Sequence, residues 1–250
     1  MDQAAIDKAA ALLIRARRTR EPLARLPEDC RPATLPDALR IQAATVEQMD
    51  ETVAGWKVGG MIEGALSYGV LLASRLVPSG GKVEARDMPL LGMEAEIAFR
   101  CLRDAPPREA AYTYDEVSER VVACAAIEIV ATRYRDYKGT PLIERVADCM
   151  SNGAFVTGDE KPGWRSLDLK KIPVSLAFGD DVVARSVGGH AAGDPLRPAV
   201  DLVNALRAGG GVRAGQLVTT GTYTGLHFAT PGVHVRAAFE GFGGAEVEVL

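Results

Sequence analysis

Residues 91–100 form an apolar run that two carboxylates, Glu94 and Glu96, interrupt. Side chains alternate between the two faces of a β-strand, so a strand here places both carboxylates on one face and the apolar side chains on the other. Two like charges on a half-buried strand repel each other and lose hydration, which is unfavourable unless a cation lies between them. The run therefore predicts either a strand that holds a divalent cation or an ordinary edge strand whose glutamates face water.

A further carboxylate lies in a second apolar run. Glu128 is the only charged residue in the β-branched segment 125–130, where apolar neighbours surround it on both sides. A buried carboxylate of this kind needs a compensating partner. Three carboxylates from two strands match the oxygen ligands that Mg²⁺ or Mn²⁺ prefers, whereas zinc prefers nitrogen and sulfur.

Composition excludes several classes of function. The chain has 250 residues, is 47% hydrophobic and 25% charged, and carries a formal net charge of −4, as expected of a globular protein without affinity for polyanions. We therefore expect neither nucleic acid nor a membrane as a partner. The start of the chain lacks the pattern of a secretory signal, and we expect a cytoplasmic protein. The four cysteines show no CxxC spacing, so a disulfide framework or a thiolate zinc site is not indicated.

Hydrophobic periodicity predicts a helical start and a β-rich remainder. Residues 2–18 and 34–49 have the apolar spacing of helices, and we assign residues 1–54 to a small helical N-terminal layer. Residues 55–250 are predicted to form a β-rich catalytic core, continuous with that layer. Within it we expect strands at 55–60, 90–100, 125–130, 174–178, 182–187, 233–239 and 245–249, helices at 113–124, 141–150 and 198–208, and a loop with a short helix at 61–78.

Two further features carry chemistry. Lys57 lies in the middle of the predicted strand 55–60, where it is either a catalytic lysine or an ordinary surface lysine. The segment Thr219–Gly225 is dense in hydroxyl groups and backbone donors, which suit a carboxylate or an oxyanion, although a plain β-turn would have a similar composition. This segment lacks the Gly-Lys-Ser/Thr ending of a phosphate-binding loop.

Five short segments in this order resemble the fumarylacetoacetate hydrolase superfamily, and within it the branch of 2-keto-4-pentenoate hydratases and 4-oxalocrotonate decarboxylases. These segments are 55–60, 94–96, 127–130, 146–153 and 220–225. The resemblance implies an α+β fold with a mixed β-roll or sandwich core, and a homo-oligomer in aromatic compound catabolism. It also implies a Mg²⁺ or Mn²⁺ ion at Glu94, Glu96 and Glu128, a catalytic lysine at Lys57, and a substrate carboxylate near Thr222.

The implied activity is that of a metal-dependent lyase, a hydratase or a decarboxylase, acting on a 2-oxo or 2-hydroxy-enoate acid through a metal-stabilised enolate. Glu63 and Ser151 are further candidate catalytic residues. Candidate substrate-binding residues are Thr220, Gly221, Thr222 and Arg133.

Two departures from the family pattern affect the choice of reaction. Residues 61–75 look shortened, and Ser67-Tyr-Gly69 stands where hydratases carry an acid, a role that Glu63 or Tyr68 would have to take over. The carbon–carbon hydrolases use a histidine and a glutamate in a lid, but no histidine precedes His190. The sequence thus favours a lyase, with decarboxylation slightly ahead of hydration. The alternatives are a hydrolase of acylpyruvate type and a non-catalytic member of the family.

Overall fold

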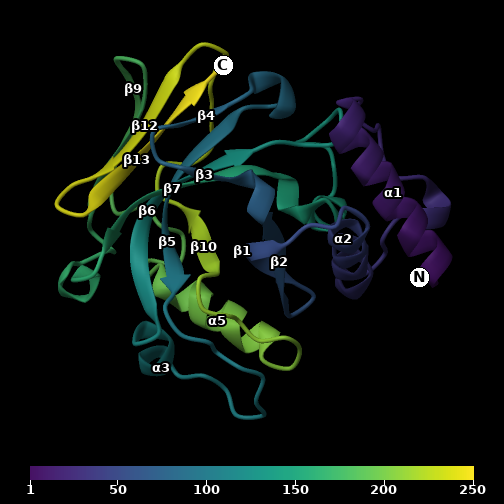
Figure 1. Cartoon of the computed structure of the whole chain (residues 1–250), viewed down its shortest axis with the longest axis horizontal. Helices are drawn as coiled ribbons and strands as arrows, with labels where there is room; N and C mark the ends of the chain where they lie inside the picture. Colours follow the sequence, from purple (N-terminus) through teal and green to yellow (C-terminus); the bar gives the residue numbers. More distant parts are fainter.

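Two β-sheets form the centre of the computed structural model, which describes residues 1–250 (Figure 1). The strands are β1 (Val53–Ile62), β2 (Ala65–Leu72), β3 (Leu76–Pro78), β4 (Gly81–Val83), β5 (Gly92–Cys101), β6 (Val121–Val130), β7 (Asn152–Lys161), β8 (Pro173–Phe178), β9 (Asp181–Val187), β10 (Leu217–Thr222), β11 (His227–Phe228), β12 (His234–Phe239) and β13 (Gly243–Val249). The larger sheet has the order β2-β1-β10-β5-β6-β7-β3, with β11 paired to β5, and the smaller has the order β4-β13-β12-β8-β9.

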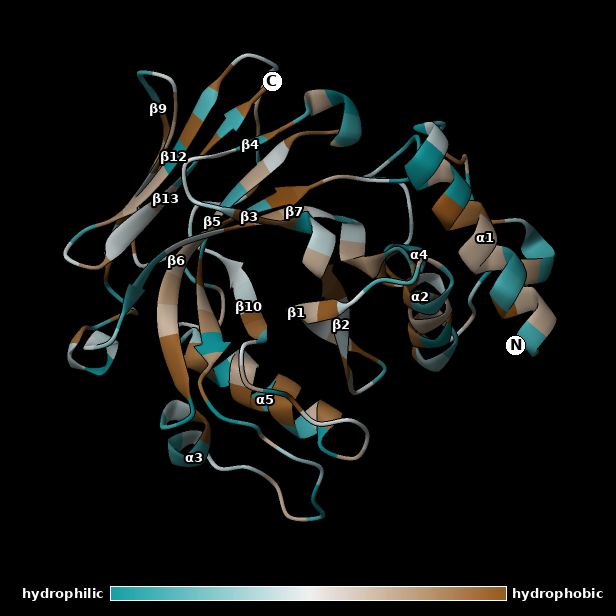
Figure 2. Ribbon diagram, in the orientation of Figure 1, coloured by the Kyte–Doolittle hydropathy of each residue, from teal (hydrophilic) through white to brown (hydrophobic).

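The main hydrophobic core joins the two sheets. On β5 the apolar residues alternate as predicted, and Met93, Ala95, Ile97 and Phe99 are all fully buried in this core. Residues of β8, β12 and β13 belong to the same core, so one face of β5 packs toward the smaller sheet. Every residue of β6 is buried, and Figure 2 colours most of this strand as hydrophobic. Packing in the main hydrophobic core therefore fixes the positions of β5 and β6.

The predicted N-terminal helices are confirmed, as α1 (Gln3–Thr19) and α2 (Leu35–Gln48). The side chains of Asp2 and Thr34 accept backbone hydrogen bonds at the two helix starts, the usual role of these residue types. Both helices share a separate hydrophobic core with α4 (Leu142–Ala147), and they lie together on one side of the molecule (Figure 1). None of the helices is long and apolar enough to cross a membrane.

The remaining helices are shorter than predicted or shifted. Thr113 and Glu116 form a capping box at the start of the helix predicted at 113–124, but α3 (Tyr114–Ser118) ends well before Cys124 because β6 begins at Val121. The helix expected at 198–208 is α5 (Leu196–Leu206). The strands predicted at 174–178 and 182–187 are confirmed as β8 and β9, which pair as an antiparallel hairpin, and the C-terminal strands are β12 and β13.

The prediction of a loop with a short helix at residues 61–78 is wrong. β1 and β2 form an antiparallel hairpin whose turn consists of Glu63 and Gly64, with φ of 50° and 82°. Two consecutive residues with positive φ are typical of the turn that suits the twist of a hairpin. The glycines scattered through this stretch hide the alternation of a strand, because they add no side chain to either face.

The predicted helix at 141–150 ends early. After α4, the residues Cys149, Met150 and Ser151 have φ of 51°, 51° and 59°. This left-handed conformation is rare for residues other than glycine and costs free energy unless the surroundings impose it. The residues 149–151, called the left-handed turn below, lead directly into β7.

Candidate metal centre

The three predicted carboxylates meet on one face of the larger sheet. Glu94 on β5 is paired directly with Glu128 on β6, and Glu96 follows two residues along β5 on the same face. One carboxylate oxygen from each residue lies within 4.8 Å of the others. Oxygen donors at this separation can share one divalent cation, and no cysteine or histidine belongs to the group.

Burial makes this carboxylate group electrostatically unfavourable without a cation. Glu96 and Glu128 are both 1% exposed. Burial, with a further contribution from Glu128, raises the pKa of Glu94 to about 7. The same two causes, in the same order, raise the pKa of Glu96 well above its usual range. A divalent cation would relieve both the repulsion and the loss of hydration, so the residues present fit such an ion.

Lys57 reaches this group from β1, two strands away from β5. Its Nζ donates a hydrogen bond to Glu128 Oε1 and a second one, of 3.1 Å, to the carbonyl oxygen of Met150. Burial by itself lowers the pKa of Lys57, but the carboxylates of Glu128, Glu94 and Glu96 outweigh this effect and raise the pKa above its usual value. Lys57 is therefore held in its charged form beside the three carboxylates and is not a surface lysine.

Thr219 supports the group in a way that the sequence did not reveal. Its hydroxyl donates to Glu96 Oε2, and the backbone N–H of Gly221 approaches the same oxygen at 3.4 Å. Thr219 on β10 is also the register partner of Lys57 on β1. The signal was present in the hydroxyl-rich segment 219–225, but nothing in the sequence identifies which hydroxyl faces Glu96.

Two glycines let the left-handed turn approach Lys57 closely. Gly69 lies opposite Lys57 in the β1–β2 hairpin, and a Cβ atom there would lie 2.6 Å from the carbonyl oxygen of Cys149. A Cβ atom on Gly59 would lie 2.5 Å from the terminal methyl group of Met150. Both distances are too short for real atoms. Gly69 therefore allows the backbone of the turn, and with it the Met150 carbonyl, to approach the Lys57 ammonium group, whereas the methyl group near Gly59 is a flexible end that can move.

Ser151 belongs to the same turn. Its side chain is buried, and its hydroxyl has no hydrogen-bond partner within the protein. Buried hydroxyls almost always have a partner, so an isolated one in the turn whose Met150 carbonyl binds Lys57 calls for an explanation. A bound substrate or water would provide the missing partner.

The other hydroxyls of the segment 219–225 have partners within the protein. The Thr220 hydroxyl lies 3.4 Å from Nε2 of His190, whose pKa is lowered by burial. The Thr222 hydroxyl accepts hydrogen bonds from the backbone of Thr224 and Gly225, at 3.1 and 3.0 Å. In this structure Thr220 thus points to His190, while Thr222 closes a turn next to Gly221.

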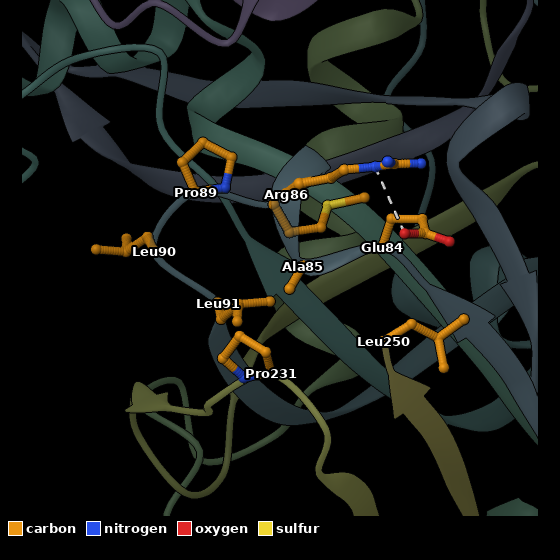
Figure 3. Close-up of a pocket in the computed structure, with 9 residues that line it drawn as sticks. Glu84, Ala85, Arg86, Pro89, Leu90, Leu91, Pro231 and Leu250 are labelled. Carbon is orange, nitrogen blue, oxygen red and sulfur yellow. Dashed lines mark ion pairs between the residues drawn. The ribbon is translucent and has the colours of Figure 1, made fainter.

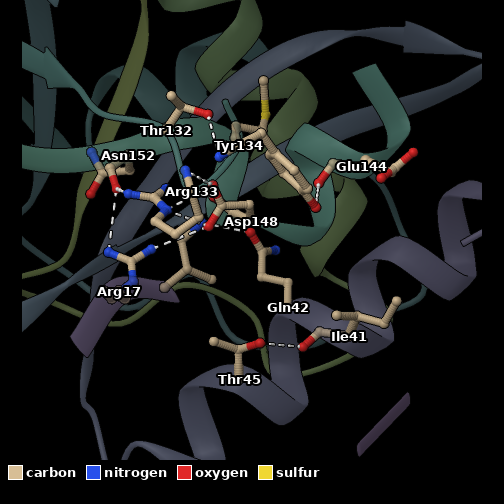
Figure 4. Close-up of polar contacts among 12 residues, drawn as sticks. Arg17, Ile41, Gln42, Thr45, Thr132, Arg133, Tyr134, Glu144, Asp148 and Asn152 are labelled. Carbon is tan, nitrogen blue, oxygen red and sulfur yellow. Dashed lines mark hydrogen bonds and ion pairs between the residues drawn. The ribbon is translucent and has the colours of Figure 1, made fainter. Parts of the chain in front are cut away.

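Two predicted site residues lie outside the carboxylate group. Arg133 is buried, and its Nε donates to Asp148 at 2.6 Å while Nη1 donates to the carbonyl of Asn152 at 3.1 Å (Figure 4). These donors are already used within the protein, because neighbouring segments fold against them.

Glu63 is exposed at the tip of the β1–β2 hairpin and makes no hydrogen bond or ion pair. Tyr68 on β2 is partly buried, which raises the pKa of its hydroxyl.

A separate hollow of about 560 Å³ lies beside the C-terminus, between the segment 84–91 and Pro231 (Figure 3). Its walls are largely apolar, with Met88, Leu91 and Leu250 among them, and Glu84 pairs with Arg86 at its edge. None of the carboxylates of the metal centre lines it. The site chemistry is therefore not located in this hollow.

Solved structures define the class of fold. The 4-oxalocrotonate decarboxylase from Pseudomonas putida G7 superimposes with a TM-score of 0.87 at 22% identity, covering 100% of this chain and 99% of that one. The 2-hydroxyhepta-2,4-diene-1,7-dioate isomerase from Mycobacterium marinum superimposes with a TM-score of 0.56 at 16% identity, over 80% of this chain and 76% of that one. The predicted α+β fold of the fumarylacetoacetate hydrolase type is thereby confirmed.

Curated relatives define the family within this class. The chain is 30% identical to 2-keto-4-pentenoate hydratase 2 of Dechloromonas aromatica over 177 residues, which cover 70% of this chain and 67% of the relative. It is 29% identical over 237 residues to the 2-keto-4-pentenoate hydratase of Paraburkholderia phymatum, covering 88% of each chain. It is 28% identical to the 4-oxalocrotonate decarboxylase of Pseudomonas sp. strain CF600, over 70% of this chain and 66% of the relative.

The chain therefore belongs to the family of 2-keto-4-pentenoate hydratases and 4-oxalocrotonate decarboxylases, which are lyases. The resemblance inferred from the five short segments is confirmed at this level. A scan of protein-family models gave no match.

Proposed function

We propose that the protein is a divalent-metal-dependent lyase that hydrates or decarboxylates a 2-oxo or 2-hydroxy-enoate acid. The observation that carries this proposal is the convergence of Glu94, Glu96 and Glu128, with Lys57 bonded to one of them, on one face of the larger sheet. The names of the relatives support it, since they include both hydratases and decarboxylases.

Glu94, Glu96 and Glu128 would hold the ion, with Mg²⁺ or Mn²⁺ as the candidates, because hard divalent cations prefer carboxylate oxygens. When bound, such an ion supplies positive charge that polarises a 2-oxo group and favours the enolate shared by hydration and decarboxylation. The similar decarboxylase structures are complexed with magnesium and adipate or with calcium and acetate, which supports a divalent ion. Thr219 and the backbone of Gly221 would keep Glu96 in place.

Lys57 is the proposed proton-transfer residue. A lysine ammonium group has three donors, and two of them are used by Glu128 and the Met150 carbonyl. The third remains for the substrate, so Lys57 could hold or deliver a proton at the enolate. The unpartnered hydroxyl of Ser151 would donate to the substrate from the adjacent turn.

The substrate carboxylate would lie near Thr222 and Gly221. The backbone N–H of Gly221 lies 3.4 Å from Glu96 Oε2, and the Thr222 hydroxyl, in the next residue, accepts a hydrogen bond from the backbone of Gly225. Arg133 and Thr220 are less suited to direct contact, because Arg133 is paired with Asp148 and Thr220 faces His190. Through these contacts, Arg133 and Thr220 would stabilise the conformation of the segments that surround the site.

The position of Glu63 affects the choice between the two reactions. Hydration needs a group that directs water onto the alkene, and Glu63 is exposed at a hairpin tip in the single chain. Tyr68, on the strand next to Lys57, is the other candidate. Decarboxylation does not need this group, and we rank it slightly ahead.

The experiment is to incubate the Mg²⁺-loaded protein with 2-hydroxypenta-2,4-dienoate, 4-oxalocrotonate and an acylpyruvate, and to follow the products by mass. Addition of water to the first or loss of CO₂ from the second would support the proposal. Cleavage of the acylpyruvate alone would assign the chain to the hydrolases, and no reaction with any of the three would favour a non-catalytic member.

We also propose, from the family resemblance, that the protein is a cytoplasmic homo-oligomer in aromatic compound catabolism. Light scattering on the purified protein tests the oligomeric state. The division into a helical layer at 1–54 and a core at 55–250 stays a prediction, and limited proteolysis near residue 54 tests it.

A further inference from the structure

Helix α1 carries an arginine that is buried but poorly paired. The side chain of Arg17 is 7% exposed. Its contacts with Asp148 Oδ1 and with the carbonyl oxygen of Asn152 are both 3.5 Å long, whereas charge-assisted hydrogen bonds are usually about 2.7–2.9 Å. Figure 4 shows that Asp148 is already engaged by Arg133, at 2.6 Å. The positive charge of Arg17 is therefore only weakly compensated.

Arg17 lines a small, partly open cavity between α1 and the sheet. The charged residues that line this cavity are Arg17, Arg20, Arg75, Arg133 and Asp87. Arg20 pairs with Asp87 at 2.6 Å, and Arg133 pairs with Asp148. Arg75 makes no hydrogen bond or ion pair with its side chain. Arg17 and Arg133 thus share one carboxylate, Asp148, and the side chain of Arg75 has no partner in the protein.

This excess charge needs an anion. A buried charge without a partner is strongly unfavourable, and arginine does not lose its proton under ordinary conditions. Burial, together with the neighbouring Arg133, lowers the pKa of Arg17 only to about 10, so the guanidinium stays charged at neutral pH. Asp87 is the only carboxylate that lines the cavity, and it is paired with Arg20. Arg75 is half-buried, so an anion from solution can reach the cavity and would supply the missing negative charge.

The size of the cavity restricts the kind of anion. Its free volume is about 10 Å³, which is the room that a single water-sized particle needs. Among common anions a monatomic halide comes nearest to this size, and phosphate or the carboxylate of a metabolite is larger. The remaining walls are Ala16, Pro89 and Gly153, which present little bulk.

We propose that this cavity is a halide-binding site, occupied by chloride, in which Arg17 and Arg75 contact the ion and Arg133 lies beside it. The ion would fasten α1 to the start of β7, since Arg17 belongs to the helix and Asn152 and Gly153 to the strand. The site shares no residue with the carboxylate group, and it does not rest on the proposed lyase activity.

The direct test is anomalous diffraction from crystals soaked in sodium bromide. We expect a bromide peak between the guanidinium groups of Arg17 and Arg75. A cavity that contains only water would overturn the proposal, and so would a cavity filled by a carboxylate from a second copy of the chain.

A solution test uses the thermal unfolding of the intact protein in sodium chloride and in sodium gluconate of equal ionic strength. Chloride should raise the midpoint of unfolding above that in gluconate, because gluconate is too large for the cavity. In Arg75→Gln the apparent chloride affinity should fall by at least about tenfold, the effect of losing one charge-assisted contact. Arg75 is preferred to Arg17 for this test, because Arg17 is needed for packing.

The matched control is Arg18→Gln, which removes an exposed arginine from the same helix. This variant should respond to chloride like the unaltered protein. An equal response to chloride and gluconate in the unaltered protein, or an unchanged response in Arg75→Gln, would contradict the proposal. Enzymatic activity is not part of either test, so a failure here leaves the proposed function untouched.

Discussion

Glu94 and Glu128 face each other as direct register partners across β5 and β6. Like charges in directly opposite positions destabilise a pair of strands, and here both strands are part of the main core. A third carboxylate, Glu96, joins them from the same face. Such an arrangement is understandable if the group is completed by a cation and by the Lys57 ammonium group.

The first prediction concerns the ligands. Glu96→Gln should lower the affinity for Mg²⁺ by at least roughly tenfold, because a neutral amide replaces one of three anionic donors. The fold should persist, since the amide can still accept the hydrogen bond from Thr219. Isothermal titration calorimetry measures the affinity and circular dichroism checks the fold. The exposed Glu119→Gln is the control, and equal Mg²⁺ affinity in both variants would argue against Glu96 as a ligand.

The second prediction concerns Lys57. Lys57→Met should reduce kcat by about 10²–10⁴-fold, the range for losing a proton-transfer group. Binding of oxalate to the Mg²⁺-loaded variant should remain, because the carboxylate ligands are intact. Lys138→Met, which removes an exposed lysine without an ion pair, should leave kcat unchanged. A normal rate of turnover in Lys57→Met would show that Lys57 does not take part in proton transfer.

The third prediction concerns pH. The pKa of Glu94 in the metal-free folded protein is about 7, above the 4.5 usual for a glutamate, so the folded state binds a proton more tightly than the unfolded chain. This contribution to stability is complete below the unfolded pKa and is lost as the pH rises through about 7. In EDTA the Tm should therefore fall between pH 5 and pH 8.

A saturating concentration of Mg²⁺ should remove most of that fall, because a bound cation stabilises the ionised carboxylates at the upper pH. Differential scanning fluorimetry at both pH values, with EDTA and with Mg²⁺, provides the comparison. An equal gain in Tm from Mg²⁺ at pH 5 and at pH 8 would contradict this prediction. It would show that Mg²⁺ binding does not depend on the ionisation of these carboxylates.

The fourth prediction concerns Gly69. Gly69→Ala places a Cβ atom against the Cys149 carbonyl, so the left-handed turn has to move away from Lys57. We expect a loss of about 1–3 kcal/mol in the free energy of unfolding, typical of overpacking, together with reduced turnover. Gly60→Ala is the control, because a Cβ atom at Gly60 meets nothing within 4 Å. Denaturant titrations measure the free energy of unfolding, and steady-state kinetics give kcat. Equal values of both quantities in Gly69→Ala and Gly60→Ala would contradict the packing argument.

Much of the carboxylate group is predictable from the sequence, since it depends on local patterns. The alternation around Glu94 and Glu96 and the isolated position of Glu128 in an apolar run both follow from the periodicity of a strand. By the same reasoning the two capped N-terminal helices were found nearly to the residue.

The features that were missed depend on contacts between distant segments. The bond from Thr219 to Glu96 joins residues 123 positions apart, and the Met150 carbonyl reaches Lys57 across 93 positions. The pairing of Arg133 with Asp148, which makes this arginine less suited to contact a substrate, also depends on the folded chain. The β1–β2 hairpin was missed because its glycines serve close approach to the left-handed turn, a need that only the folded chain creates.

The most direct test of the central claim is a crystal structure of the protein soaked with Mg²⁺ and oxalate. The account predicts one Mg²⁺ ion bound by oxygens of Glu94, Glu96 and Glu128, with oxalate on the ion and the Lys57 ammonium group within hydrogen-bond distance of oxalate. An ion bound elsewhere, or a carboxylate group that stays without metal at saturating Mg²⁺, would contradict it.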